Sequence, residues 1–246
     1  MALLDKFRLD GKVAVVTGAG KGIGAGIARA FAEAGADVVI GARTAADLER
    51  VAQDIRAMGR RALVVTTDVL DFAQLQHLAD RALQEFGRID ILVNNAGGFP
   101  PKPVAKTTAR EFEGAFRFNV STAFELSRIC APLMVDSAGG GAILNISSIA
   151  GHKPTPCFAA YGTAKGALSL LPQELAQEFA PKVRVNAIAE LEDFGEVLLH
   201  GLEDIALGAL YLCTPAASYV TGEILGVNGG LERLNMQMPR AWGGMG

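Results

Sequence analysis

A glycine-rich stretch that directly follows a short apolar run constrains this chain most. Residues 13–24 read Val-Ala-Val-Val-Thr-Gly-Ala-Gly-Lys-Gly-Ile-Gly, and an alanine-rich helical pattern follows at once, from Ile23 to Ala34. The glycines, spaced Gly18-x-x-x-Gly22-x-Gly24, let the backbone turn tightly and approach a phosphate without a Cβ in the way. The start of the helix adds unpaired N–H groups and a partial positive charge. We therefore predict a dinucleotide-phosphate loop here, although ordinary turns also carry this spacing.

Strand-like apolar runs alternate with helical patterns along the whole sequence, and no short hairpin turn joins two runs. This alternation predicts an α/β fold, a doubly wound Rossmann-type parallel sheet with helices on both faces, formed by residues 1–246 as a single domain. The predicted strands are Val13–Val16, Val38–Ile40, Ala62–Thr66, Ile89–Val93, Ala142–Ser147, Val183–Ile188 and Glu223–Val227, and two of the predicted helices are Thr108–Met134 and Tyr161–Phe179.

Composition excludes several classes of function. The net charge is −3 and no block of Lys and Arg is present, which argues against nucleic-acid binding. No apolar run reaches the roughly 18 residues of a membrane helix. Three scattered cysteines, three scattered histidines and a charged N-terminus without a secretory pattern indicate reduced thiols and no metal site. We therefore expect a cytoplasmic protein that acts on a small molecule.

Residues that follow the strands are the candidate cofactor contacts, because ligands of such sheets bind beyond the carboxyl ends of the strands. No acidic residue directly follows the second strand, whereas Arg43 stands there and Lys21 lies in the glycine turn. Two cations suit a 2′-phosphate, so we predict NADP(H) rather than NAD(H). The alternative is that both are solvated surface charges. The predicted contacts are Gly18, Lys21, Gly22, Ile23, Gly24, Arg43, Asp68, Val69, Asn95, Ala96, Gly97, Tyr161 and Lys165.

Two of these positions have a second interpretation. Asp68 follows the third strand, where it suits the adenine or only caps a turn. Asn95, Ala96 and Gly97 follow the fourth strand, where they suit the ribose or a tight turn.

Tyr161 and Lys165 lie one helical turn apart on one face of their predicted helix. A nearby positive charge lowers the pKa of a phenol by roughly 1–3 from its unperturbed value of about 10, toward the range useful for proton transfer. The alternative is a tyrosine packed by chance beside a solvated lysine.

Taken together and in order, several short patterns resemble the short-chain dehydrogenase/reductase family. They are Thr17-Gly18-x-x-x-Gly22-Ile23-Gly24, Asn94-Asn95-Ala96-Gly97, Asn119, Ser148 and Tyr161-x-x-x-Lys165. The match runs from about Leu9 to Ile188 and from about Glu203 to Gly230. It looks closest to bacterial hydroxysteroid dehydrogenases and 3-oxoacyl-carrier-protein reductases.

The resemblance implies an NADP(H)-dependent oxidoreductase that transfers a hydride between the nicotinamide and a ketone or secondary alcohol. Tyr161 would be the general acid or base, and Ser148 would bind the substrate oxygen. Lys165 would hold the ribose hydroxyls and lower the pKa of Tyr161, and Asn119 would anchor a relay water. The resemblance also implies a homotetramer or dimer that pairs through the helices at 108–134 and 161–179.

The chain departs from the family after the sixth strand. A Pro-Gly turn is usual there, but the sequence reads Ala189-Glu190-Leu191. In addition, the segment 189–203 is shorter than the substrate loop of the family. Either a lid is missing or the sequence omits a stretch. A catalytically impaired sensor or scaffold is therefore the alternative function. A nucleotide-sugar epimerase shares Tyr-x-x-x-Lys but has another glycine spacing and a longer C-terminal domain.

Some residues stay outside the predicted site. His152 and Cys157 either line the substrate pocket or only pack in a loop. We expect Phe112, Phe116 and Phe118 in the core or at a subunit contact rather than in the cofactor site.

Overall fold

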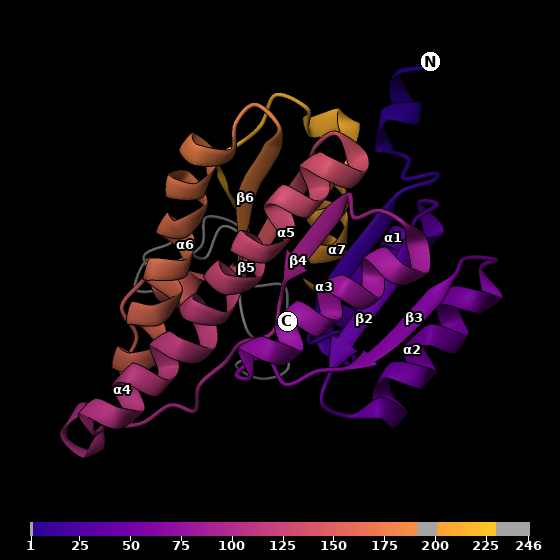
Figure 1. Cartoon of the computed structure of the whole chain (residues 1–246). Helices are drawn as coiled ribbons and strands as arrows, with labels where there is room; N and C mark the ends of the chain where they lie inside the picture. Colours follow the sequence, from indigo (N-terminus) through magenta and orange to yellow (C-terminus); the bar gives the residue numbers. More distant parts are fainter. Residues whose placement is uncertain (1, 191–200, 230–246) are drawn as a thin grey trace, which may run out of the picture.

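A computed structural model describes residues 2–190 and 201–229 (Figure 1). Within them, seven parallel strands form one sheet in the order β3-β2-β1-β4-β5-β6-β7. This arrangement confirms the predicted doubly wound Rossmann-type fold. The strands are β1 (Val13–Thr17), β2 (Asp37–Ala42), β3 (Ala62–Thr66), β4 (Ile91–Asn94), β5 (Gly141–Ser148), β6 (Val183–Glu190) and β7 (Ile224–Val227).

Helices cover both faces of the sheet. Figure 1 shows α3 and α5 in front of the strands and α7 behind them. One face packs on α1, α2 and α7, and the other packs on α3, α5 and α6. The helices are α1 (Gly22–Glu33), α2 (Ala45–Ala57), α3 (Phe72–Phe86), α4 (Ala109–Phe116), α5 (Thr122–Ala138), α6 (Ala159–Phe179) and α7 (Gly201–Cys213).

The two cores follow from the alternation of side chains along each strand. Val16 of β1 packs with Phe31 of α1 on one face, whereas Val15 packs with Leu75 of α3 on the other. Strand β1 is buried throughout, as its unbroken apolar run indicates.

The predicted helix Thr108–Met134 is interrupted. Helix α4 ends at Phe116, a π-helical segment spans Arg117–Ser121, and α5 continues to Ala138. Asn119 lies in this segment, and its Nδ2 donates to the Ala115 carbonyl at 2.8 Å. Such side-chain bonding to the preceding turn competes with regular helical bonding, and π segments are frequent at functional sites.

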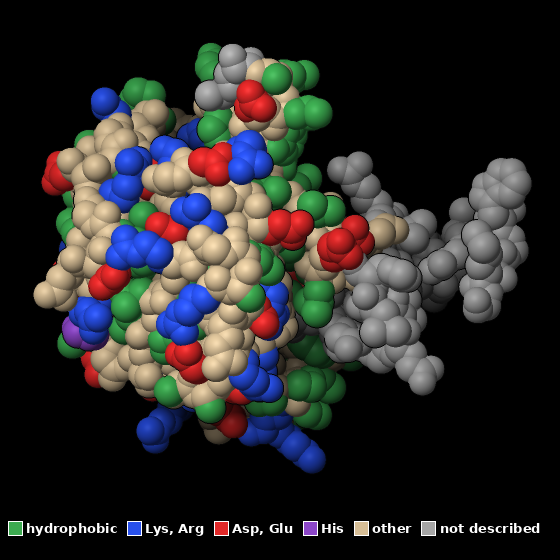
Figure 2. All heavy atoms as spheres, turned by 90° about the vertical axis from the view of Figure 1, so that its right-hand side faces the viewer, with side chains coloured by type: hydrophobic (Ala, Val, Ile, Leu, Met, Phe, Trp, Pro, Cys, Tyr) green, Lys and Arg blue, Asp and Glu red, His purple; other side chains and the backbone are tan. Residues whose placement is uncertain are grey.

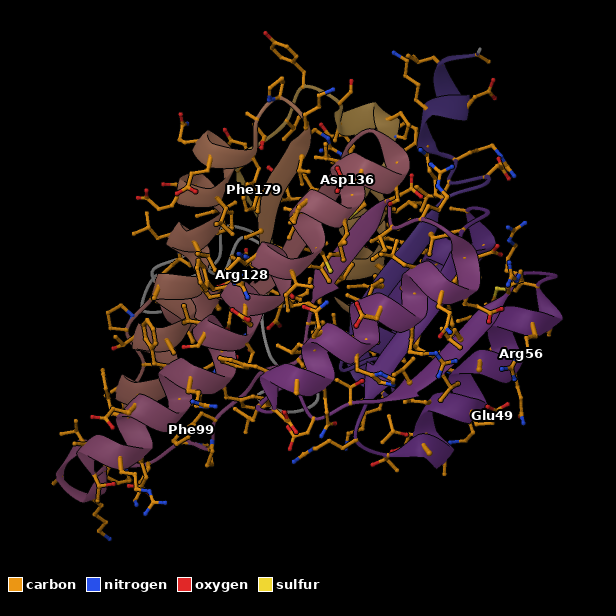
Figure 3. All side chains as sticks on the ribbon, viewed as in Figure 1. Glu49, Arg56, Phe99, Arg128, Asp136 and Phe179 are labelled. Carbon is orange, nitrogen blue, oxygen red and sulfur yellow. The ribbon has the colours of Figure 1, made fainter. Side chains whose placement is uncertain are left out.

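The remaining features of the fold are a helix cap and the charges on the surface. Gly87, at φ +73°, ends α3 as its sequence position indicates. Glu49 and Arg56 form an ion pair of 2.5 Å on α2 (Figure 3). Figure 2 shows acidic and basic side chains interspersed on the side of the molecule that carries α2 and β3. Among residues 2–190 and 201–229, no helix is long and apolar enough to cross a membrane.

The carboxyl ends of the parallel strands lie at one end of the sheet, where the arrowheads of β2 and β3 point in Figure 1. Phe99 lies at this end, whereas Asp136 and Phe179 lie at the other (Figure 3). The predicted site residues therefore belong to the end that carries Phe99.

Candidate functional site

A pocket of about 570 Å³ lies at the carboxyl ends of β1 to β4. It contains ten of the predicted cofactor contacts, namely Gly18, Lys21, Gly22, Ile23, Arg43, Asp68, Val69, Asn95, Ala96 and Gly97. Its other lining residues are Gly20, Ala42, Thr44, Asp47, Thr67, Leu70 and Phe118. Residues that are far apart in the sequence thus meet where the strand-end rule places a nucleotide.

The glycine loop and the loop after β4 are tied together beneath this pocket. Asn95 Nδ2 donates to the carbonyl oxygens of Thr17 at 2.9 Å and Gly18 at 3.2 Å. Thr17 Oγ1 in turn accepts from the backbone N–H groups of Asn95 at 3.0 Å and Ala96 at 3.1 Å. Asn95 therefore holds the two loops together, and it also lines the pocket.

Gly24 is required for packing rather than as part of the pocket lining. A Cβ there would lie 2.4 Å from Asn95 Nδ2 and 2.6 Å from the Gly18 carbonyl oxygen, which is closer than real Cβ contacts. Gly18 itself has φ +64°, where only glycine is unstrained. The loop therefore holds its backbone against the start of α1 and leaves the space above it open for a phosphate.

Two cations border the pocket. Lys21 and Arg43 are both exposed lining residues, and neither forms an ion pair within the described ranges 2–190 and 201–229. The nearest acid after β2, Asp47, is paired with Arg50. Figure 2 shows basic side chains extending from the lower rim of the face that carries α2, the end at which the strands finish.

Asp68 caps a turn and lines the pocket, while its predicted contact with the adenine stays a prediction. Its Oδ1 accepts from the backbone N–H of Leu70 at 3.0 Å.

Gly97 connects this pocket to the predicted catalytic residues. A Cβ at Gly97 would lie 2.7 Å from Asn119 Oδ1 and 3.5 Å from Lys165 Nζ. Asn119 Oδ1 also accepts from the backbone N–H of Gly98 at 2.8 Å. The π-helical segment thus holds the end of the β4 loop beside Lys165.

Tyr161 and Lys165 lie together on the buried face of α6. Their exposed fractions are 1% and 3%, and Lys165 Nζ is 5.5 Å from the centroid of the Tyr161 ring. Lys165 Nζ donates to the Ile146 carbonyl at 2.8 Å. The rings of Phe158 and Tyr161 pack in a T-shaped arrangement, with 5.8 Å between ring centroids. This burial argues against a chance pair with a solvated lysine.

Ser148 is the last residue of β5 and is buried, and its Oγ accepts from the backbone N–H of Ala150 at 3.2 Å. Its register partner on β6 is Glu190, which is also buried. In the sequence, Glu190 stands out only as a departure from the usual Pro-Gly turn. The strand register shows that this residue lies beside Ser148 of β5. Most of the unusual segment 189–203 lies outside the described residues.

His152 and Cys157 line a second pocket of about 420 Å³ beside the start of α6, with Phe158 and Thr163. Neither Ser148 nor Tyr161 lines it. Within the described part of the chain, no group of three metal-ligating side chains occurs.

Phe118 lines the cofactor pocket and also packs against the core that α3, α5 and α6 form on the sheet. The prediction that it stays out of the cofactor site is therefore wrong, whereas the prediction that it packs in the core is confirmed. Phe112 and Phe116 are exposed and lie outside the core, and their predicted subunit contact stays a prediction.

The comparisons with known proteins agree with this geometry. A family model described as short chain dehydrogenase matches residues 12–190. An uncharacterized oxidoreductase of Mycobacterium tuberculosis is 44% identical over 262 residues, covering 96% of this chain and 98% of that protein. The chain therefore belongs to the short-chain dehydrogenase family, as its sequence patterns predict.

Among its relatives is a 7alpha-hydroxysteroid dehydrogenase of Escherichia coli K12, 39% identical over 257 residues, covering 94% of this chain and 98% of the relative. A solved 7alpha-hydroxysteroid dehydrogenase, in complex with NADH and 7-oxo glycochenodeoxycholic acid, has a TM-score of 0.87 at 39% identity and covers 94% of this chain and 98% of its own. Membership in this family makes the protein an oxidoreductase that transfers a hydride between a nicotinamide cofactor and a CH–OH or C=O carbon.

Proposed function

We propose that this protein is an NADP(H)-dependent dehydrogenase/reductase of ketones and secondary alcohols, with Tyr161 as its general acid and base. The observation that carries the proposal is the buried Tyr161–Lys165 pair, with 5.5 Å between the ammonium nitrogen and the ring centroid. It lies beside Gly97, at the end of the 570 Å³ pocket. A proton-transfer pair next to a dinucleotide pocket suits carbonyl reduction.

The residues around the pair divide the work of proton transfer. In reduction, the Tyr161 hydroxyl donates its proton to the carbonyl oxygen, and in oxidation the phenolate accepts it. The Lys165 ammonium favours the phenolate by its charge. Ser148 hydrogen-bonds the same substrate oxygen, and Asn119 anchors a water through which Lys165 regains a proton. When bound, the nicotinamide supplies or accepts the hydride.

The preference for NADP(H) rests on the cations at the pocket. Lys21 and Arg43 lack carboxylate partners within the described ranges, while Asp47 is already paired with Arg50. A 2′-phosphate between two exposed cations forms charge-assisted hydrogen bonds, whereas the acidic residue that would bind a 2′-hydroxyl does not directly follow β2.

Hydride transfer is tested with NADPH that carries deuterium on the transferred position. We would incubate it with oxosteroids, 3-oxoacyl thioesters and small diketones, and analyse the products by mass spectrometry. Deuterium in a product alcohol supports the proposal, and its absence from every product contradicts it. The oxosteroids are included because relatives of this chain are hydroxysteroid dehydrogenases.

The substrate segment at 189–203 is proposed to be shorter than in relatives. The alignment with the M. tuberculosis protein extends over 262 positions, more than the 246 residues of this chain, so that protein contains residues without a counterpart here. A shorter segment would cover a bound substrate less completely, and the enzyme would then accept a broader range of substrates.

We also propose a cytoplasmic homo-oligomer, a tetramer or dimer. Phe112 and Phe116 of α4, Phe124 of α5 and Leu170 of α6 are exposed apolar side chains on helices at one side of the sheet. Burying them against a second copy would be favourable. Light scattering after size-exclusion chromatography measures the state, and a monomer at micromolar concentration contradicts the proposal.

A further inference from the structure

Three polar side chains beside the catalytic residues, the buried Ser147 and Ser169 and the exposed His152, are joined by hydrogen bonds. Ser147 Oγ lies 2.9 Å from the Lys165 carbonyl oxygen and 2.7 Å from Ser169 Oγ. Ser169 Oγ lies 2.8 Å from His152 Nε2. Ser147 is fully buried and directly precedes Ser148, so the chain reaches the residue next to the predicted substrate-binding serine.

The donor and the acceptor in each of these hydrogen bonds follow from counting the available protons. The Lys165 carbonyl can only accept, so the single Ser147 hydroxyl proton goes to it. Ser169 must then donate to Ser147, and His152 Nε2–H must donate to Ser169. Each hydroxyl both donates and accepts, an arrangement in which neighbouring bonds strengthen one another.

Hydrogen bonds thus attach both the ammonium group and the main-chain carbonyl of Lys165 to β5. Its ammonium donates to the Ile146 carbonyl at 2.8 Å, and its main-chain carbonyl accepts from Ser147, the next residue of the strand. Two consecutive strand residues thus fix both the side chain and the backbone of Lys165. Tyr161, one turn earlier on the same helix, depends on the same attachment.

The loop after Ser148 touches α6 at the same place. A Cβ on Gly151 would lie 2.5 Å from the backbone nitrogen of Gly166 and 2.6 Å from the Lys165 carbonyl carbon. His152, the next residue, is the far end of the hydrogen-bonded chain. Strand β5, the loop and α6 therefore meet around the backbone of Lys165.

We propose that Ser147 is a positioning residue, which holds the Lys165 backbone against β5 so that the ammonium stays beside Tyr161. This inference rests on the proposed function, since it concerns the reactivity of the same pair. Ser147 does not act on the substrate itself. Its role matters because a displacement of about 1 Å at a reacting centre can cost about 100-fold in rate.

The test is the titration of Tyr161 in Ser147→Ala. The chain has three tyrosines, so the phenolate of Tyr161 is resolved by subtracting the ultraviolet absorbance titration of Tyr161→Phe in each background. We expect the pKa of Tyr161 to rise by about 0.5–1 in Ser147→Ala, a fraction of what a close opposite charge produces. We also expect kcat to fall by about 10- to 100-fold.

Ser137→Ala is the matched control. Ser137 Oγ likewise donates to a helical carbonyl, that of Leu133, and also accepts from the backbone N–H of Ile89. It lies near the amino end of β4, at the end of the sheet away from Tyr161, so its loss should leave the Tyr161 titration unchanged. Ser147→Cys keeps the shape of the side chain, with a somewhat larger sulfur atom, but supplies only a weak donor. It should reproduce the shift of Ser147→Ala even if that variant folds poorly.

The outcomes separate this inference from the proposed function. An unchanged Tyr161 titration in folded Ser147→Ala or Ser147→Cys overturns the positioning role. A rise in both, restored to the parent value in Ser147→Thr, supports it. If the parent protein reduces no ketone, the proposed function fails, yet the phenolate titration still reads out the effect of Ser147.

Discussion

The Lys165 ammonium donates a hydrogen bond of 2.8 Å to the Ile146 carbonyl, so strand β5 sets the position of the charge that faces Tyr161. Replacing Lys165 with Met keeps the length of the side chain and removes this charge. We expect the pH profile of alcohol oxidation to move to higher pH, because the phenolate loses its stabilising cation. We also expect kcat to fall by about 100-fold or more. An unshifted pH limb in a folded variant would exclude the electrostatic role of Lys165.

The cofactor preference depends on Lys21 and Arg43. Arg43→Ala should weaken NADPH binding by about tenfold, because one charge-assisted phosphate contact is worth roughly 1.5 kcal/mol at an exposed site. NADH binding should stay within about twofold. Fluorescence titration measures both, and Lys21→Ala tests the second cation in the same way.

The control for these variants is Arg128→Ala, since Arg128 is an exposed arginine of α5 that is paired with Glu125 at 2.6 Å (Figure 3). It should bind both cofactors as the parent protein does. Equal losses for NADPH and NADH in Arg43→Ala would show that the arginine does not select the 2′-phosphate.

Asp90 lies directly before β4, at the amino ends of β1 and β4, away from the cofactor pocket. Burial opposes ionisation of its carboxylate, but hydrogen bonds from Arg88, the Val13 N–H and Lys12 outweigh this effect, and the pKa of Asp90 is lowered. Asp90→Asn should lower the free energy of unfolding at pH 7 by about 1–3 kcal/mol, a partial loss because Arg88 and Lys12 can be resolvated.

The pH dependence gives this effect a sign. Because the pKa of Asp90 is lower in the folded state, its stabilisation is fully present above the unfolded value of about 3.9 and is lost as pH falls through the folded value. Denaturant unfolding of the parent protein and Asp90→Asn should therefore converge in acid. A difference that does not shrink as the pH falls below the unfolded value would contradict this account. Asp54→Asn, at an exposed ion pair with Arg29, should cost little at any pH.

Gly151 and Gly114 form a matched pair of glycines. A Cβ on Gly151 would overlap the backbone of α6, at 2.5 Å from the Gly166 nitrogen. Gly151→Ala should therefore displace the loop after Ser148 and lower kcat. Gly114 lies inside α4 with nothing within 4 Å of its Cβ position, so Gly114→Ala should stabilise the protein by up to about 1 kcal/mol. Steady-state kinetics and calorimetry compare the two, and equal kcat values would refute the tight contact at Gly151.

Much of the fold could be predicted because each of its signals is local. Apolar runs bounded by glycines define the strands, and the strand-end rule brings Gly18, Arg43 and Asp68 into one pocket although they are far apart in the sequence. The same rule applied to every strand would also have identified Thr67 and Ala42 as lining residues.

Other features depend on tertiary contacts that no local pattern carries. The interruption at Asn119 requires the loop of Gly98 to be near, and the burial of Glu190 follows from its register with Ser148. The hydrogen bonds that link His152, Ser169 and Ser147 join three separate segments of the fold. No local sequence pattern around either serine predicts these bonds.

The most direct test of the proposed function compares the parent protein with Tyr161→Phe, which lacks only the hydroxyl oxygen. NADPH and NADH consumption would be followed over the ketone panel, after titration has shown that both proteins bind NADPH equally. We expect the parent protein to reduce at least one ketone with NADPH, and the variant to lose about 100- to 10,000-fold in kcat/KM. Equal turnover by Tyr161→Phe would contradict the role of Tyr161. Tight NADPH binding without turnover of any ketone would favour a non-catalytic cofactor-binding protein.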